Sequence, residues 1–295
     1  MFSARRGAHL LAMATVAASL SACDAQLPFT SSSAVTWNGG SISMQAYQDR
    51  LKLQEFLDRK TATTTPPPAT SPQGKAEELQ RQDRVAEDMA DELLMEAEDQ
   101  RRHIMPSDSD VAKLFDVTKS SYQPTSGAAT FDNYLELYGY TEDTFRTELK
   151  HRLAEQKLEN ALAAQRVASA LADLKAGKDF GAVAKTWSDD EGTAVNGGQA
   201  HFSPQALQVM DPNVRPGLDG LQPGQQSTQA ARGTNGYYLF KVISRDANGV
   251  TFLVVQVTAP VIEAYRKSGR PQWFRDYISK LEKDAGVKYH VGSHA

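Results

Sequence analysis

Turn-forming motifs divide residues 174–242 into short segments. A helix-like segment ends at Gly177, a polar turn follows Trp187, and a strand-like segment, Gly236–Val242, closes the series. Between them stand Ser188-Asp189-Asp190, Gly197-Gly198 and Leu221-Gln222-Pro223-Gly224. Glycines and Pro-Gly pairs interrupt regular structure and mark turns. The stretch therefore predicts a unit of short helices and strands joined by tight turns.

In this order the motifs resemble the second half of a parvulin-type (PpiC-like) peptidyl-prolyl isomerase domain. The resemblance places Asp190 on the polar wall of a proline pocket, and Met210 and Val214 on its apolar floor. Tyr238 stands where the family keeps an inner histidine. The glycines that match the structural motifs of the family are Gly197, Gly198, Gly224 and Gly236.

The family strand that carries a second active-site histidine has no counterpart before Gly177. We expect the apolar run Thr251–Val257, which contains no histidine, to pair in the sheet in its place. A tyrosine side chain has one hydroxyl, whereas a histidine side chain can form hydrogen bonds through two ring nitrogens. The sequence therefore predicts a degenerate isomerase site and leaves open whether the domain still catalyses. No cofactor is implied, and the scattered histidines show no metal-ligand spacing.

The N-terminus reads as an export signal followed by a lipidation site. Arg5 and Arg6 precede an apolar run, Leu10–Leu20, that is too short to span a bilayer. Leu20-Ser21-Ala22-Cys23 resembles a bacterial lipobox, and Cys23 is the single cysteine of the chain. We expect residues 1–22 to be a signal peptide, Cys23 to carry a lipid, and residues 23–33 to tether the protein to a membrane outside the cytoplasm.

The next segment begins with a short strand and an Asn-Gly turn in Val35–Ser43, with Ser43 as the N-cap of a helix. Three consecutive prolines at positions 66–68 predict an extended loop over residues 61–74. An amphipathic helix is expected from Lys75 to His103. These elements resemble the opening of a SurA-type chaperone domain.

Further helices follow the same resemblance. Pro106-Ser107-Asp108-Ser109-Asp110 predicts a capped helix start, and Thr141 is expected to cap a long helix that reaches Leu174 with a break near Ala164. Pro271–Leu281 is amphipathic and precedes a strand-like segment, Val287–Val291. SurA-type proteins return such a segment to the N-terminal helical domain, and we expect the same here.

Together these patterns predict an α+β protein related to the SurA/PrsA-like foldases. Its expected parts are an all-α chaperone domain at 34–164, a parvulin-like domain with a small antiparallel-rich sheet at 165–258, and a C-terminal helical segment at 259–295 that completes the chaperone domain. A net charge of −4 without a Lys/Arg block argues against a nucleic-acid partner.

The resemblance implies a chaperone for unfolded exported polypeptides. The alternatives are an active prolyl isomerase and a scaffold lipoprotein that holds one folded partner.

Overall fold

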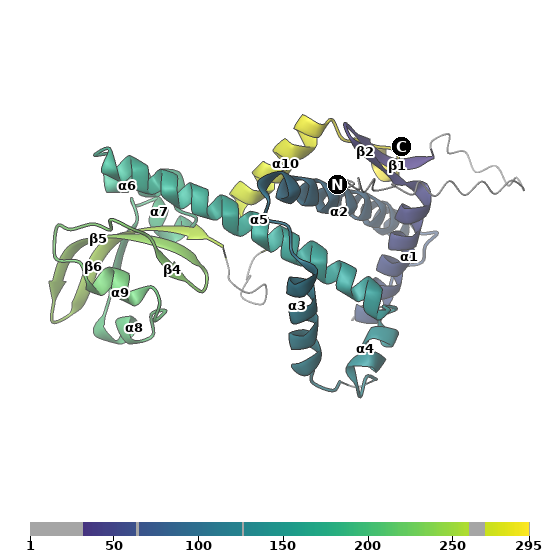
Figure 1. Cartoon of the computed structure of the whole chain (residues 1–295), viewed down its shortest axis with the longest axis horizontal. Coiled ribbons are helices and arrows are strands. Elements are labelled where there is room, and N and C mark those ends of the chain that lie inside the picture. The colour runs from purple at the N-terminus through teal and green to yellow at the C-terminus, as the bar shows by residue number, and fades with distance from the viewer. Residues whose placement is uncertain (1–31, 63–64, 126, 260–268, 295) are drawn as a thin grey trace, which may run out of the picture.

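The protein, described here from a computed structural model, is α+β as expected (Figure 1). The structure describes residues 32–62, 65–125, 127–259 and 269–294. Cys23, the signal peptide and most of the tether lie outside the described residues. The α-helices are α1 (Met44–Thr61), α2 (Pro72–Arg102), α3 (Asp108–Ser120), α4 (Phe131–Leu137), α5 (Glu142–Lys175), α6 (Phe180–Trp187), α7 (Glu191–Ala194), α8 (Pro204–Gln208), α9 (Arg215–Asp219) and α10 (Gln272–Ala285). The strands are β1 (Ser33–Trp37), β2 (Gly40–Ser43), β3 (Gln199–Phe202), β4 (Ala231–Gly233), β5 (Gly236–Asp246), β6 (Gly249–Thr258) and β7 (Lys288–Tyr289).

The helical domain also contains a small sheet, so it is not purely helical. Strands β1 and β2 form a hairpin around Asn38-Gly39, where Gly39 has φ of 113°. Strand β7 from the C-terminus pairs with the other edge of β1. The Ser43 hydroxyl accepts a hydrogen bond from the Ala46 N–H and caps α1, as the sequence predicts. The return of the C-terminal segment to this domain is thereby confirmed.

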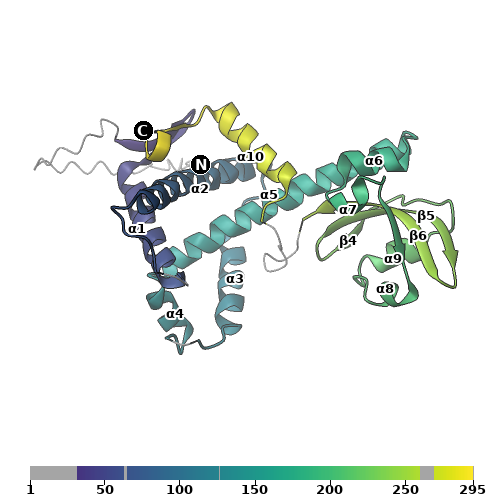
Figure 2. The same ribbon diagram turned by 180° about the vertical axis from the view of Figure 1, so that it is seen from behind.

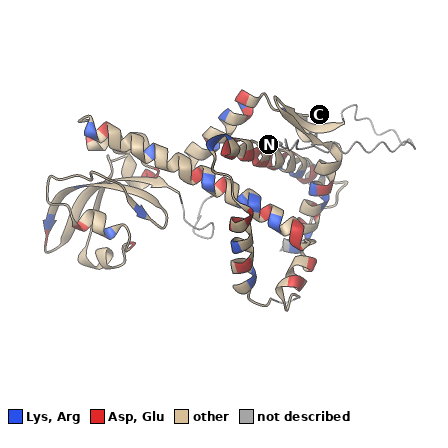
Figure 3. Cartoon of the chain, viewed as in Figure 1, with Lys and Arg blue, Asp and Glu red and all other residues tan. Residues whose placement is uncertain are grey.

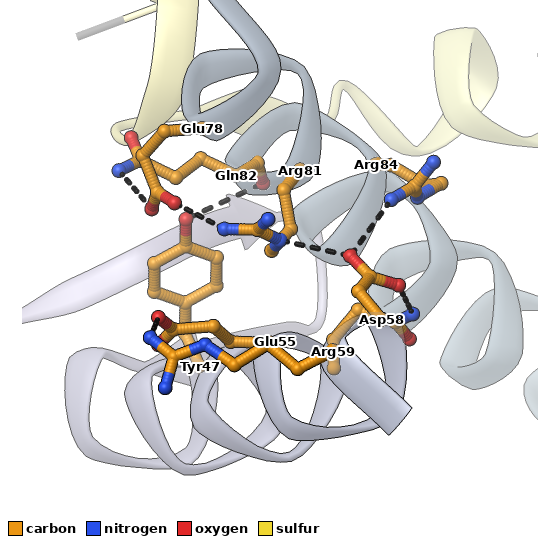
Figure 4. Close-up of polar contacts among 9 residues, drawn as sticks. Tyr47, Glu55, Asp58, Arg59, Glu78, Arg81, Gln82 and Arg84 are labelled. Atoms are coloured by element: carbon orange, nitrogen blue, oxygen red, sulfur yellow. Dashed lines mark hydrogen bonds and ion pairs between the residues drawn. The ribbon is translucent and has the colours of Figure 1, made fainter. Parts of the chain in front are cut away.

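Helix α2 begins earlier than the sequence indicates. Ser71 is its N-cap and Pro72 its first residue, a position where the missing N–H of proline costs nothing. The predicted loop therefore loses its last three residues to the helix. Figure 4 shows the polar contacts beside this loop: Arg81 Nε donates to Asp58 Oδ2 at 2.9 Å, and the Tyr47 hydroxyl donates to the Gln82 carbonyl at 3.3 Å. These contacts join α1 to the first turns of α2.

Helices α3 and α4 extend from the rest of the helical domain (Figure 1). A capping box of Ser107 and Asp110 starts α3, and Thr141 caps α5, so both predicted helix starts are confirmed. Charged residues follow one another along α2 and the first half of α5, whereas the four-stranded sheet contains few (Figure 3).

Helix α5 is continuous, and the expected break near Ala164 is wrong. The span Glu142–Lys175 contains no glycine or proline, and Ala163 and Ala164 are strong helix formers. The helix instead changes its apolar partners at this point. Leu158 and Leu162 pack with residues of α2 and α10, whereas the stretch from Ala163 to Leu174 packs with α6 and with the sheet. The boundary proposed at residue 164 therefore falls inside one helix that both domains share.

The second domain is built on a four-stranded antiparallel sheet with the order β3-β6-β5-β4. The run Thr251–Val257 lies within β6, a central strand, which confirms its place in the sheet. Gly198 and Gly236 have φ of 82° and 150°, and a Cβ at either would meet the backbone of β6 at 2.3 Å or less. Gly197 and Gly224 also have positive φ, so all four predicted glycines occupy backbone positions that favour glycine.

Helix α10 lies along the helical domain, as Figure 2 shows from behind. Phe274 and Ile278 of α10 are buried against Met95 of α2 and Leu158 of α5. Among the described residues, no helix is both long and apolar enough to cross a membrane.

Candidate functional site

An open aromatic groove lies between α3, α4 and the first half of α5. Its volume is about 580 Å³. The residues that line it are Leu114, Thr118, Ser121, Tyr122, Phe131, Tyr134, Tyr140, Phe145, Leu149, Arg152, Leu153 and Gln156. We call this surface the aromatic groove.

Edge-to-face ring contacts fix the walls of the aromatic groove. Phe131 contacts Phe115 at a centroid distance of 5.7 Å and Phe145 at 5.6 Å, and Tyr134 stacks on Phe131 at 5.9 Å. Such pairs add about 0.5–1.5 kcal/mol each beyond the area that they bury. Helices α3 and α4, which carry Phe115, Phe131 and Tyr134, are short, so the shape of the groove depends on this aromatic cluster.

Arg152 is the single charged side chain among the lining residues. Its Nε donates to Glu148 Oε1 at 3.1 Å, which holds the guanidinium at the rim. Burial raises the pKa of the Tyr134 and Tyr140 hydroxyls, so both stay neutral at physiological pH. No Asp or Glu is among the described residues that line the groove. An apolar side chain of a polypeptide can therefore enter the groove without contacting a negative charge.

The sheet domain brings the predicted pocket residues together. Val214 is buried in an apolar cluster on one face of the sheet, and Met210 and Tyr238 pack against that cluster. The ring of Tyr238 stacks on Phe240 with centroids 6.3 Å apart. Asp190 precedes α7, where its Oδ2 accepts a hydrogen bond from Thr193 Oγ1 at 2.7 Å.

Two carboxylates lie near the Tyr238 hydroxyl. Burial raises the pKa of Tyr238, and the charges of Asp211 and Asp190 raise it further. Sequence reasoning missed Asp211, which accepts hydrogen bonds from the N–H groups of Thr234 at 2.6 Å and Asn213 at 2.9 Å. These bonds lower its pKa. The only sequence signal for it is Asp211-Pro212-Asn213, a motif typical of a turn.

His201 does not substitute for the missing histidines. Ala200 and Phe202 of β3 pack against the apolar cluster that contains Val214. Because side chains alternate along a strand, His201 points to the opposite face of the sheet. There its Nδ1 lies 3.1 Å from Thr251 Oγ1. Val214, Met210 and Tyr238 thus share one apolar cluster, in which Val214 is a buried core residue. Burial keeps the Tyr238 hydroxyl neutral.

Comparison with protein families agrees with both halves of this arrangement. The model described as SurA-like N-terminal domain matches residues 6–159, more than half of the chain. The chain belongs to the SurA-like N-terminal domain family. The model described as PPIC-type PPIASE domain matches residues 147–244, so the second domain is of the rotamase type. The two matches overlap within α5.

Curated relatives carry the names of chaperones and foldases. The chain is 31% identical over 151 residues to the Chaperone SurA of Burkholderia lata, which covers 50% of this chain and 32% of that protein. It is 35% identical over 79 residues to the Foldase protein PrsA of Lacticaseibacillus paracasei, covering 27% and 26%. The matches thus span a third or less of the length of these relatives. The solved structure of the PrsA foldase from Lactococcus lactis is 13% identical with a TM-score of 0.34, over 88% of this chain and 95% of that one.

Proposed function

We propose that this protein is an extracytoplasmic, membrane-tethered chaperone that binds unfolded exported polypeptides in the aromatic groove. Membership of the family and the names of the relatives support the chaperone class. A lipid on Cys23 would supply the tether. The rotamase-type domain contributes binding of proline-containing segments, with weak or no catalysis.

The observation that carries the proposal is the aromatic groove itself. Unfolded polypeptides expose aromatic and aliphatic side chains that folded proteins bury. The groove has a volume of about 580 Å³, within the ~300–1,000 Å³ typical of binding sites, and its lining is mostly apolar. Its side chains are already held by mutual ring contacts, so little ordering accompanies binding.

Tyr238 is the reason to expect weak or no catalysis. Rotation of an X-Pro bond crosses a barrier of roughly 20 kcal/mol, and the family pocket places two histidines around the bond. Here a tyrosine takes the inner position. The second histidine of the family lies on a strand whose place we assign to β6. Strand β6 is a central strand of the sheet and contains no histidine.

Suppression of aggregation of an unfolded exported protein tests the proposal, beside a protease-coupled prolyl-peptide assay. Leu114→Ser and Tyr134→Ser should each weaken suppression about tenfold, because an apolar contact worth about 1.4 kcal/mol changes an affinity by that factor. The matched control is Val117→Ser in the same helix, because Val117 is 61% exposed and does not line the groove.

Equal effects of Leu114→Ser and Val117→Ser would contradict the role of the groove. Robust isomerisation that Tyr238→Phe abolishes would favour the alternative, an active prolyl isomerase. Circular dichroism of each variant separates loss of binding from loss of structure.

A further inference from the structure

The guanidinium of Arg166 lies between two tryptophans where the domains meet. Arg166 belongs to α5, Trp187 ends α6 in the sheet domain, and Trp273 belongs to α10, which packs on the helical domain. The guanidinium carbon lies 5.0 Å from the ring centroid of Trp273 and 5.6 Å from that of Trp187. A cation close to two indole rings is attracted by both π-systems.

Asp189 joins this cluster to the sheet through three donors. Its Oδ1 accepts from Arg166 Nη2 at 3.2 Å. Its Oδ2 accepts from Trp273 Nε1 at 2.9 Å and from the Thr258 N–H, at the end of β6, at 2.7 Å. One carboxylate therefore links α5, α10 and the last residue of a central strand.

Burial makes this carboxylate costly to misplace. The side chains of Asp189 and Arg166 are 15% and 24% exposed. Burial raises the pKa of Asp189 and lowers that of Arg166, and the ion pair between them opposes both shifts. Arg166 Nε is buried and makes no hydrogen bond with any described residue. A buried pair of this kind stabilises little by itself and strongly penalises the loss of one partner.

The cluster lies where α5 passes from one apolar core to the other. Leu162 belongs to the core of the helical domain and Val167 to that of the sheet domain, with Arg166 beside Val167 on the same helix. Bending of α5 at this point would change the angle between the domains. The α3–α4 pair and the α8–α9 segment both lie below α5 in Figures 1 and 2, so that angle sets their separation.

We propose that Asp189 is a positioning residue: with Arg166, Trp187 and Trp273 it forms a latch that holds the sheet domain at one angle to the helical domain. This latch sets the orientation of the domains whichever polypeptide the protein binds. Asparagine cannot replace Asp189, because each carboxylate oxygen of Asp189 accepts hydrogen bonds. The amide NH₂ of asparagine would place N–H donors against the donors at one of these two positions.

Distance measurement between two spin labels tests the latch. The full chain would carry Cys23→Ser, with labels at Asp116→Cys in α3 and Ala247→Cys in the β5–β6 turn, both exposed positions. We expect one narrow distance distribution in the parent, and a distribution about twofold broader for Asp189→Asn, as relative domain motion is restored. Trp273→Phe, which keeps an aromatic ring and removes one donor, should broaden it less.

The matched control is Asp190→Asn at the next residue, whose carboxylate accepts a side-chain hydrogen bond from Thr193 in α7, the helix that Asp190 precedes. It should leave the distribution unchanged. A folded Asp189→Asn protein with the parent distribution would overturn the proposal, as would equal broadening by Asp190→Asn. If Asp189→Asn does not fold, an unchanged distribution in Trp273→Phe overturns it equally. Aggregation suppression measured on the same variants reports on the chaperone function separately.

Discussion

Replacing Arg270 with methionine should destabilise the helical domain. Arg270 stands two residues before α10 and binds carboxylates on two other helices. Its Nη1 donates to Asp91 Oδ2 of α2 at 2.6 Å, and its Nε and Nη2 donate to the two carboxylate oxygens of Glu155 of α5 at 2.9 and 3.2 Å. The three side chains are 24%, 14% and 20% exposed. Methionine keeps most of the apolar stem and leaves both carboxylates without this cation.

The magnitude follows from that burial. Removing one partner of a fully buried ion pair costs about 3–5 kcal/mol, and the remaining exposure of these groups reduces the expected loss to about 2–3 kcal/mol. For a protein of this size that corresponds to a fall in the melting temperature of about 5–10 °C. The control is Arg59→Met, because Arg59 is 71% exposed and its pair with Glu55 is worth at most about 1 kcal/mol.

The loss should depend on pH. Burial raises the pKa of Asp91 to about 6 even though Arg270 opposes the shift, so without Arg270 the pKa rises further. A raised carboxyl pKa contributes stability that is present at low pH and is lost as pH rises through the folded-state value. The deficit of Arg270→Met relative to the parent should therefore be larger at pH 8 than at pH 5.

Thermal unfolding followed by far-UV circular dichroism at both pH values measures these differences. Arg270→Met and Arg59→Met melting alike at pH 8 would refute the argument from burial. A deficit that stays constant between pH 5 and pH 8 would refute the assignment of the charge on Asp91.

Three further predictions address the tether, the C-terminal segment and the proline pocket. Cys23→Ala should release the protein from membranes and change its processed size; a membrane-bound variant of unchanged size would exclude lipidation at Cys23. Deletion of residues 260–295 should lower the melting temperature of the helical domain by more than the loss of one exposed helix would, since burying Phe274 alone is worth about 3 kcal/mol or more; an unchanged melt would argue against the return of this segment as a structural part. Asp190→Ala and Tyr238→Phe should leave aggregation suppression nearly unchanged, and a strong loss in either would show that the sheet domain, more than the aromatic groove, holds the client.

Local chemistry made much of the fold predictable. The caps at Ser43, Ser107 and Thr141 act through hydrogen bonds over three residues, so their sequence signals are sufficient. The apolar run in β6 was recognisable because both of its faces are covered. The pairing of β7 with β1 was anticipated only as a return of the C-terminal segment, because no local rule relates strands so far apart in sequence.

The site was predictable in part for the same reason. Met210, Val214 and Tyr238 were placed by resemblance, and the fold brings them to one cluster. Asp211 was missed because its position near Tyr238 depends on the path of a loop. The sequence motif does not distinguish Asp189 from its neighbour Asp190. Which of the two carboxylates turns inward depends on contacts with α5 and α10, which lie outside the motif.

The continuity of α5 bears on how this protein can be dissected. Any fragment that ends within the helix exposes the leucines, valines and alanines that the other fragment would have buried, so neither half is a complete folding unit when cut at a single point. Two fragments that both contain α5 are the smallest pieces in which each core keeps its partners. Each fragment would then contain its own copy of α5 and could bury its core on that copy. Mixing the two fragments should therefore not reconstitute the intact protein. The shared helix also fixes the rotation of one domain relative to the other. An insertion or deletion in α5 would rotate one domain about the helix axis by roughly 100° per residue. We therefore expect tolerated changes of chain length to lie in the loops.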